Sequence, residues 1–262
     1  MDQNNKNIYE SFIELIKILK ILRSPNGCEW DKKQTSESLI PYLLEETYEV
    51  IEAIEDKNSD ALKEELGDLI LHILFQAEIA QESNDFDISD SLKYISNKLI
   101  KRHPNVFPEK NNSKNINQSW EQLKQKENKR KSILDGVPKN MSALIRARRI
   151  QEKAASVGFD WHQISPVIDK VDEEILELKE AITLSKIENI KNEMGDVFFS
   201  LVNLCRFLDL NPEETLRMTI TKFTKRFNMV DDELKKRGKT FQNSNLEEMD
   251  EIWNLIKKKA CK

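Results

Sequence analysis

One acidic pattern occurs twice in this chain, in the same register. Three clustered glutamates are followed, after fifteen residues, by a glutamate and an aspartate; the first copy comprises Glu45, Glu46, Glu49, Glu65 and Asp68, and the second, 128 residues later, comprises Glu173, Glu174, Glu177, Glu193 and Asp196. Between residues 45 and 68, ten of the 24 aligned pairs are identical, and six of the ten are acidic. A shared helical propensity would reproduce an apolar pattern, but not acids at fixed positions. We infer a duplicated unit that retains its acids.

The fold class follows from the periodicity of the apolar residues. They recur at helical spacing along most of the chain, and no stretch of any length alternates with the period of a β-strand. With 33% charged residues and only six glycines among 262 residues, the composition is that of a helical and highly soluble protein. We expect an all-α chain of two tandem, related helical bundles, with modules at 1–128 and 141–262 and a linker at 129–140.

The expected helices follow the same order in both modules. In the first module the pattern predicts helices at about 8–23, 36–53, 61–80, 88–102 and 120–129, with loops around Trp30 and at 108–118. In the second it predicts helices at about 143–157, 166–181, 185–208, 211–237 and 247–259. Ser185-x-x-Glu188 resembles a capping box, Asn211 is placed to cap the next helix, and Gly238 to end it.

Composition also excludes several classes of function. A net charge of about −5 does not favour broad attraction to a nucleic-acid polymer or an anionic membrane. Cys28, Cys205 and Cys261 are far apart and form no C-x-x-C pair, which fits a reducing compartment rather than a disulfide or zinc framework. No signal peptide and no bilayer-length apolar run is present, so we expect a cytoplasmic protein without membrane association.

The spacing of the acids indicates a cation site. Residues three apart on a helix share a face, so Glu46 lies beside Glu49 and Glu65 beside Asp68. Fifteen intervening residues fit an antiparallel helix pair, whose acidic faces can meet. Two like charges 4 Å apart repel by about 4 kcal/mol at an effective dielectric constant near 20, so four clustered carboxylates need a cation. Carboxylate oxygens favour a hard ion, Mg²⁺ before Mn²⁺ or Ca²⁺.

A single cluster of this kind would more often be a solvated helix face. Its repetition, and the apolar runs that directly follow Asp68 and Asp196, favour a site in this chain. Gly67 and Gly195 lie inside the expected helices at a cost of about 1 kcal/mol relative to alanine, which indicates close approach of a neighbour or a ligand.

Basic and aromatic pairs also recur. Lys98 and Arg102, like Lys222 and Arg226, are four residues apart on one helix face and suit phosphate oxygens. Two Trp-x-x-x-Lys pairs also occur, Trp120 with Lys124 and Trp253 with Lys257. Each tryptophan could stack on a nucleobase or pack in the core, and both alternatives stay open. His72, within an apolar run, is expected in the core.

With these residues in view, the sequence resembles the MazG family of all-α nucleoside triphosphate pyrophosphohydrolases, in its two-module form. The resemblance rests on E-E-x-x-E followed by E-x-x-D, together with the segments Cys28–Asp31, Lys101–Pro104, Leu134–Pro138 and Val157–Trp161. It implies Mg²⁺-dependent hydrolysis of NTPs or dNTPs to a monophosphate and pyrophosphate by a homodimer. Asn192 departs from the pattern, since an acid is common there and the first module has Glu64.

The resemblance also implies roles for individual residues. It assigns the metal to Glu174, Glu177, Glu193 and Asp196, which with Lys222 and Arg226 would be the catalytic residues, and a weaker second metal set to Glu46, Glu49, Glu65 and Asp68. It assigns substrate binding to Lys170, Glu173, Lys222, Arg226, Trp253 and Lys257.

The two modules differ in ways that favour the second as the catalytic one. Lys170 precedes the second glutamate pair by three residues, whereas the first module has Tyr42 there. The helix bearing Arg226 continues for about three turns, whereas Pro104 ends its counterpart just after Arg102. The first module would then be structural or regulatory. An alternative for the whole chain is a regulatory or scaffold protein that binds Mg²⁺–nucleotide without hydrolysing it.

Overall fold

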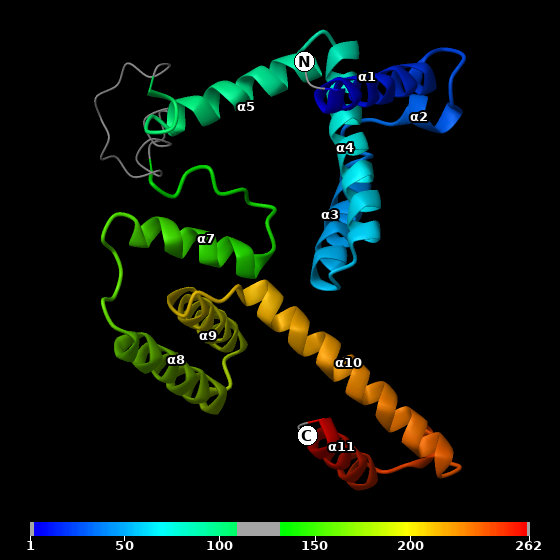
Figure 1. Ribbon diagram of the computed structural model, residues 1–262. Helices are drawn as coiled ribbons and strands as arrows, with labels where there is room; N and C mark the ends of the chain where they lie inside the picture. Colours follow the sequence, from blue (N-terminus) through cyan, green and yellow to red (C-terminus); the bar gives the residue numbers. More distant parts are fainter. Residues whose placement is uncertain (1–2, 109–131, 261–262) are drawn as a thin grey trace. The chain divides into compact units, whose positions relative to one another are not determined.

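The computed structural model describes residues 3–108 and 132–260, and every regular element within these ranges is a helix (Figure 1). The all-α class is therefore confirmed. The chain divides into two compact units, residues 1–117 and 118–262, and each is described by itself. The expected helix at 120–129, with Trp120 and Lys124, lies outside the described residues, as do most of the loop at 108–118 and the start of the linker. The module boundaries stay a prediction.

The first unit consists of α1 (Gln3–Arg23), α2 (Glu29–Lys33), α3 (Ile40–Glu55), α4 (Ser59–Glu82) and α5 (Ile88–Arg102). The four helices expected between residues 8 and 102 are present, but the loop expected around Trp30 contains the short helix α2. The core of the first unit is formed by Leu19 of α1, Leu39 before α3, and Leu74 and Phe75 of α4.

Local signals explain where these helices begin and end. Asn58 caps α4, its side chain accepting hydrogen bonds from the backbone N–H groups of Asp60 and Ala61. Asp87 and Asp90 form a reciprocal capping box at the start of α5. The short connection at residues 56–58 reverses the chain, so α3 and α4 are antiparallel neighbours, as expected (Figure 1).

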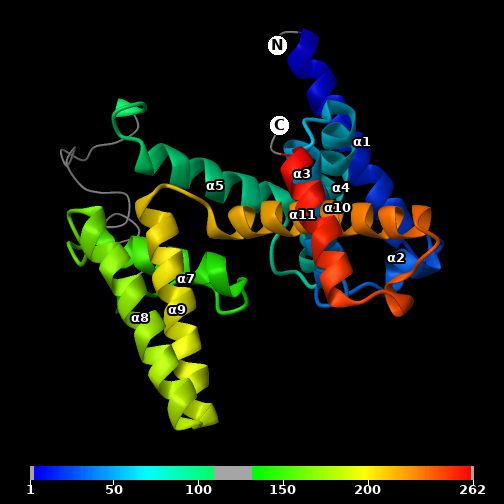
Figure 2. The same cartoon turned by 90° about the horizontal axis from the view of Figure 1, so that it is seen from below.

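The second unit consists of α7 (Ala143–Ala155), α8 (Ile164–Leu184), α9 (Ile187–Phe207), α10 (Pro212–Lys236), the 3₁₀-helix η2 (Phe241–Asn243) and α11 (Leu246–Ala260). Helices α8 and α9 lie side by side as an antiparallel pair in both views (Figures 1 and 2). Helix α11 packs on the C-terminal half of α10 through Val230, Leu234, Ile252 and Ile256.

The connection between α8 and α9 corrects one expectation. Ser185 does not open a capping box, because it adopts a left-handed conformation (φ 55°) at the end of α8, and its hydroxyl donates to the carbonyl of Ile182 at 3.4 Å. Lys186 is the N-cap of α9 and makes no side-chain cap. A left-handed residue commonly ends a helix, and Ser185 takes that role here instead of capping α9. The cap at Asn211 and the helix end before Gly238 are confirmed.

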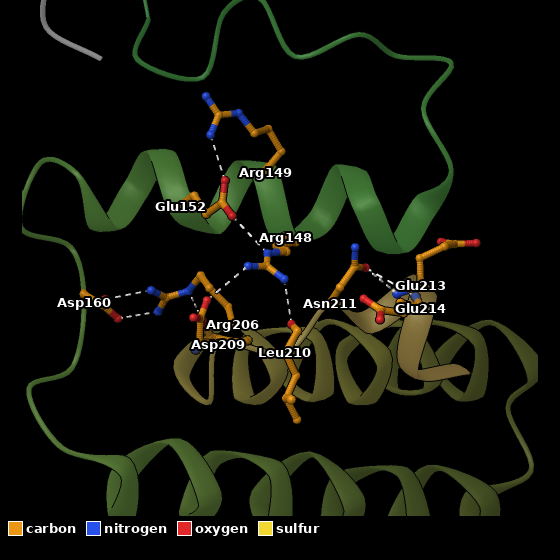
Figure 3. A network of polar contacts seen from close by, with 11 residues as sticks. Arg148, Arg149, Glu152, Asp160, Arg206, Asp209, Leu210, Asn211, Glu213 and Glu214 are labelled. Carbon is orange, nitrogen blue, oxygen red and sulfur yellow. Dashed lines mark hydrogen bonds and ion pairs between the residues drawn. The ribbon is translucent and has the colours of Figure 1, made fainter. Parts of the chain in front are cut away.

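A polar network fixes the ends of α8 and α9 (Figure 3). Arg206, near the end of α9, donates two hydrogen bonds to Asp160 in the loop before α8. Arg148 of α7 donates to the carbonyl of Leu210 at 2.7 Å and to Glu152 at 2.9 Å. Burial by itself would raise the pKa of Glu152, but hydrogen bonds from Arg149 and Arg148 outweigh it and lower that pKa. The network therefore holds the loop before α8 and the turn after α9 in place.

Candidate metal and nucleotide site

The second acidic cluster is assembled across the α8–α9 pair. Glu174 and Glu177 come from α8 and Glu193 from α9, and one carboxylate oxygen of each lies within 4.8 Å of the others. Glu174 is buried, with 7% of its surface exposed, whereas Glu177 is exposed. The expectation that the two acidic faces meet is therefore confirmed for these three residues.

The donor set suits a hard divalent cation. Carboxylate oxygens are the only ligand atoms in the group, and Mg²⁺ takes oxygen ligands at about 2.0–2.1 Å, which places opposite ligands about 4.2 Å apart. Asp196 is exposed on α9 and is not part of this group, so its role as a fourth ligand stays a prediction.

Lys170 contacts this cluster directly. Its Nζ lies 2.7 Å from Glu174 Oε1 and 2.9 Å from Glu173 Oε1, one turn further along α8. These two carboxylates raise the pKa of Lys170 well above its usual range. Burial and the neighbouring Glu174 raise the pKa of Glu177, while Lys170 opposes the rise. The second cluster is therefore partly neutralised by an ammonium of the same helix.

The first acidic cluster repeats the arrangement without that ammonium. Glu46 and Glu49 of α3 and Glu65 of α4 place one carboxylate oxygen each within 4.8 Å of the others. Burial raises the pKa of Glu46, and the negative charge of Asp68 raises it further. Burial also raises the pKa of Glu65, and there the largest contribution from a neighbouring acid comes from Glu49. Asp68 therefore interacts electrostatically with Glu46 and Glu65, although it is not one of the three grouped ligands.

His72 adds a feature to the first cluster that the sequence did not predict. It is buried, as expected of a core residue, but its Nε2 lies 3.8 Å from Glu46 Oε1. Burial lowers the pKa of His72, with Asp68 opposing, so the imidazole is neutral at neutral pH. Its ring stacks on Tyr42 with 6.4 Å between centroids, and Trp30 meets Tyr42 edge-on at 5.7 Å. The sequence did contain a signal for this difference between the two units, because the residue that aligns with His72 in the second unit is Ser200.

The expected phosphate-binding residues lie on α10. Lys222 is exposed and Arg226 half-buried, and neither forms an ion pair with another residue of the described chain. The structure does not bring them into contact with the three glutamates. Helix α10 continues for ten residues beyond Arg226, and α5 ends at Arg102, which is buried; both helix lengths are as expected.

Trp253 and Lys257 lie on α11. The Trp253 ring is half-buried and packs on Phe223 of α10, with 5.2 Å between ring centroids. Lys257 is exposed. The indole thus contributes to the core between α10 and α11, and stacking on a nucleobase stays a prediction.

The two helix glycines have no packing explanation within the chain. A Cβ atom built on Gly67 or Gly195 would meet no atom within 4 Å. Close approach of a neighbouring segment, one of the two expected reasons for these glycines, is therefore wrong for the described chain. Approach of a ligand, the other expected reason, stays a prediction.

Comparison with known proteins agrees with this geometry. The MazG nucleotide pyrophosphohydrolase domain matches residues 34–107 and 164–230. The chain is 45% identical over 248 residues to the nucleoside triphosphate pyrophosphohydrolase/pyrophosphatase MazG of Thermotoga maritima, covering 94% of this chain and 95% of that protein. It is 42% identical over 252 residues to the nucleoside triphosphate pyrophosphohydrolase of Escherichia coli strain K12, covering 93% and 96%. It is also 41% identical over 260 residues to the uncharacterized protein YabN of Bacillus subtilis, covering 97% of this chain and 53% of that protein.

Two tandem all-α units, each with a glutamate cluster across a helix pair, agree with the class of metal-dependent pyrophosphohydrolases that the family match gives. The chain belongs to the MazG nucleotide pyrophosphohydrolase family.

Proposed function

We propose that this protein hydrolyses nucleoside and deoxynucleoside triphosphates to the monophosphate and pyrophosphate, with Mg²⁺ as the metal and Mn²⁺ as a substitute. The observation that carries the proposal is the group of Glu174, Glu177 and Glu193, whose oxygens lie within 4.8 Å of one another in a chain of this family. The relatives of Thermotoga maritima and Escherichia coli, both named as nucleoside triphosphate pyrophosphohydrolases, align over more than nine-tenths of the chain, including both clusters.

The residues of the second unit would have different roles in the reaction. Glu174, Glu177 and Glu193, joined by Asp196, would hold the cation. When bound, a hard divalent cation neutralises phosphate charge and makes water a stronger nucleophile at neutral pH. Lys222 and Arg226 are free of ion pairs within the described chain and would stabilise the charge that develops on the phosphates. Lys170, Glu173, Trp253 and Lys257 would complete the contacts to the nucleotide.

The second unit is proposed as the catalytic one. Among the residues that the structure describes, a lysine pairs with a grouped glutamate in the second cluster and not in the first, and α10, unlike α5, extends well beyond its Lys/Arg pair and packs on a further helix. The first unit would hold a cation at Glu46, Glu49 and Glu65, beside Asp68, in a structural or regulatory role.

Separation of reaction products tests the activity directly. The full chain is incubated with each dNTP and Mg²⁺, and the products are resolved by anion exchange. Monophosphate and pyrophosphate in equal amounts support the proposal. Diphosphate and phosphate would identify another hydrolase, and no product would favour the alternative of a regulatory protein that only binds Mg²⁺–nucleotide.

The exposed apolar side chains of α9 support a homodimer. Phe198, Phe199 and Leu201 are 56%, 45% and 41% exposed in the single chain. Large apolar side chains grouped in this way mark an interaction surface, and a second copy would cover them. Sedimentation at micromolar concentration should give twice the chain mass, and a monomer there would contradict the dimer.

We also propose a cytoplasmic location. Cys28 and Cys205 are free thiols, which fits a reducing compartment. Among the described residues, no helix combines the length and hydropathy that crossing a bilayer requires.

A further inference from the structure

Lys170 makes an ion pair with a buried glutamate of the second cluster. The pair joins a lysine to a glutamate four residues later, and this order is less stabilising in a helix than the reverse order. Its acceptor, Glu174, is the most buried of the three grouped carboxylates. The ammonium is therefore placed on the one ligand that water solvates least.

The first unit provides an internal comparison. Tyr42 stands at the position that corresponds to Lys170, and no lysine or arginine forms an ion pair with Glu46, Glu49 or Glu65 in the described chain. Glu46 instead has Nε2 of the His72 imidazole at 3.8 Å. Two clusters with the same three glutamates thus differ in one positive charge.

We propose that Lys170 is an exchangeable counter-ion: it neutralises Glu174 until a divalent cation enters the cluster, and it then turns to the phosphates of the nucleotide. This inference rests on the proposed function, since it takes a divalent cation and a triphosphate as the ligands of the second unit. An ammonium and a divalent cation repel each other on one carboxylate, so the cation displaces the ammonium. Lysine suits this exchange because its compact charge is carried on a flexible stem.

Two consequences distinguish this exchange from a fixed substrate contact. The metal must displace an ammonium to bind, so removing Lys170 strengthens metal binding when no nucleotide is present. The freed ammonium attracts phosphate only after the metal has bound, so Lys170 increases the coupling between metal and nucleotide. Because coupling between two ligands is reciprocal, it can be measured from either side.

The test measures Mn²⁺ binding by electron paramagnetic resonance of the free ion, without nucleotide. The full chain carries Glu65→Gln, which weakens the first cluster so that binding reports the second. Lys170→Met removes the charge at similar length, and Lys170→Arg keeps it. Lys179→Met is the matched control, since Lys179 is an exposed lysine of the same helix and forms no ion pair within the part of the chain that the structure describes.

Lys170→Met should bind Mn²⁺ about tenfold more tightly than the parent, a factor within the usual range of coupling between ligands. Lys170→Arg should match the parent, and Lys179→Met should differ by no more than about twofold, as expected of a screened surface charge. Unchanged or weaker Mn²⁺ binding in Lys170→Met, or an equal gain in Lys179→Met, overturns the exchange. Far-ultraviolet circular dichroism verifies that each variant is folded, and Lys170→Tyr, which copies the first unit, replaces Lys170→Met if that variant does not fold.

A second measurement uses a dATP analogue with a methylene bridge between the α and β phosphates. Mn²⁺ should increase the affinity of the parent for this analogue by a larger factor than that of Lys170→Met. An equal factor in both proteins overturns the exchange. Pyrophosphate release is assayed separately, so a chain that shows the expected Mn²⁺ and analogue binding but no turnover contradicts the enzymatic activity and leaves the exchange supported.

Discussion

Arg206 and Asp160 form a two-pronged ion pair, with Nη1 at 2.9 Å from Oδ2 and Nη2 at 2.5 Å from Oδ1. The pair joins the end of α9 to the loop that leads into α8, the two helices that carry the second glutamate cluster (Figure 3). Its side chains are only 13% and 25% exposed, so water screens the interaction weakly. The contact therefore helps to hold the helix pair on which the site is built.

The first prediction concerns the stability of this pair and its dependence on pH. Asp160→Asn should lower the free energy of unfolding by about 1.5–3 kcal/mol at pH 7, the range for hydrogen bonds to charged groups. Hydrogen bonds from Arg206 lower the pKa of Asp160, so the stabilisation is complete above the unfolded-state pKa near 4 and is lost as pH falls through the lower folded-state value. Urea titrations of both proteins between pH 7 and pH 2 measure this difference.

A matched control is available at the same end of α9. Asp209 lies 3.7 Å from Arg148 with a fully exposed side chain, so Asp209→Asn should change stability by less than about 0.5 kcal/mol. Equal losses in the two variants, or a difference for Asp160→Asn that persists at pH 2, would contradict the role of the half-buried pair.

The sequence predicted most of the fold because apolar residues keep the helical period and local signals mark the helix ends. Helix α5 was predicted at both ends, since Pro104 lies just beyond it. The turn at Ser185 was not predicted, because its left-handed conformation is imposed by the packing of α8 on α9 and not by the local sequence. Capping and tertiary packing competed there, and packing determined the outcome.

The candidate site was also predicted only in part, because helical spacing fixes some of its contacts and the packing of helices fixes the others. The grouping of Glu174, Glu177 and Glu193 followed from repeated spacing, which fixes helix faces. The approach of His72 to Glu46 did not, because the distance between residues 26 positions apart depends on how α4 is rotated against α3. Helical periodicity specifies which face is buried, but not which polar atom meets which across the interface.

The second prediction concerns the helix glycines. Gly195→Ala and Gly67→Ala should each raise the free energy of unfolding by about 1 kcal/mol, since alanine is favoured in helices and the added methyl group meets no atom of the chain. If Gly195 admits a ligand beside Glu193, its variant should lose turnover, whereas Gly67→Ala should keep it. Thermal unfolding and dNTP hydrolysis are measured on the same samples. Full turnover in Gly195→Ala would exclude ligand approach at that position.

The third prediction separates the two roles of Trp253. Trp253→Ala should lower the free energy of unfolding by about 2 kcal/mol, less than the 3–5 kcal/mol for fully buried aromatic residues, because the ring is half-buried against Phe223. Trp253→Phe keeps an aromatic ring and should cost less than about 1.5 kcal/mol. If the indole also stacks on the base, Trp253→Phe should raise KM for dNTPs several-fold with little change in stability. An unchanged KM in that variant would leave the indole with a packing role alone.

The last prediction concerns which unit carries the reaction. Glu193→Gln and Glu65→Gln make the same change at corresponding positions, preserving side-chain shape while removing one charge from each glutamate cluster. Because the second unit combines its cluster with Lys170 and the extended α10, Glu193→Gln should lower kcat by about 10²–10³-fold, the scale for losing one charge-stabilising group. Glu65→Gln should retain most of the turnover. Both variants are assayed with the same dNTP at saturating Mg²⁺, and circular dichroism verifies that each is folded. Loss of turnover in Glu65→Gln alone would assign catalysis to the first unit, and a halved rate in each variant would mean that both units are enzymes.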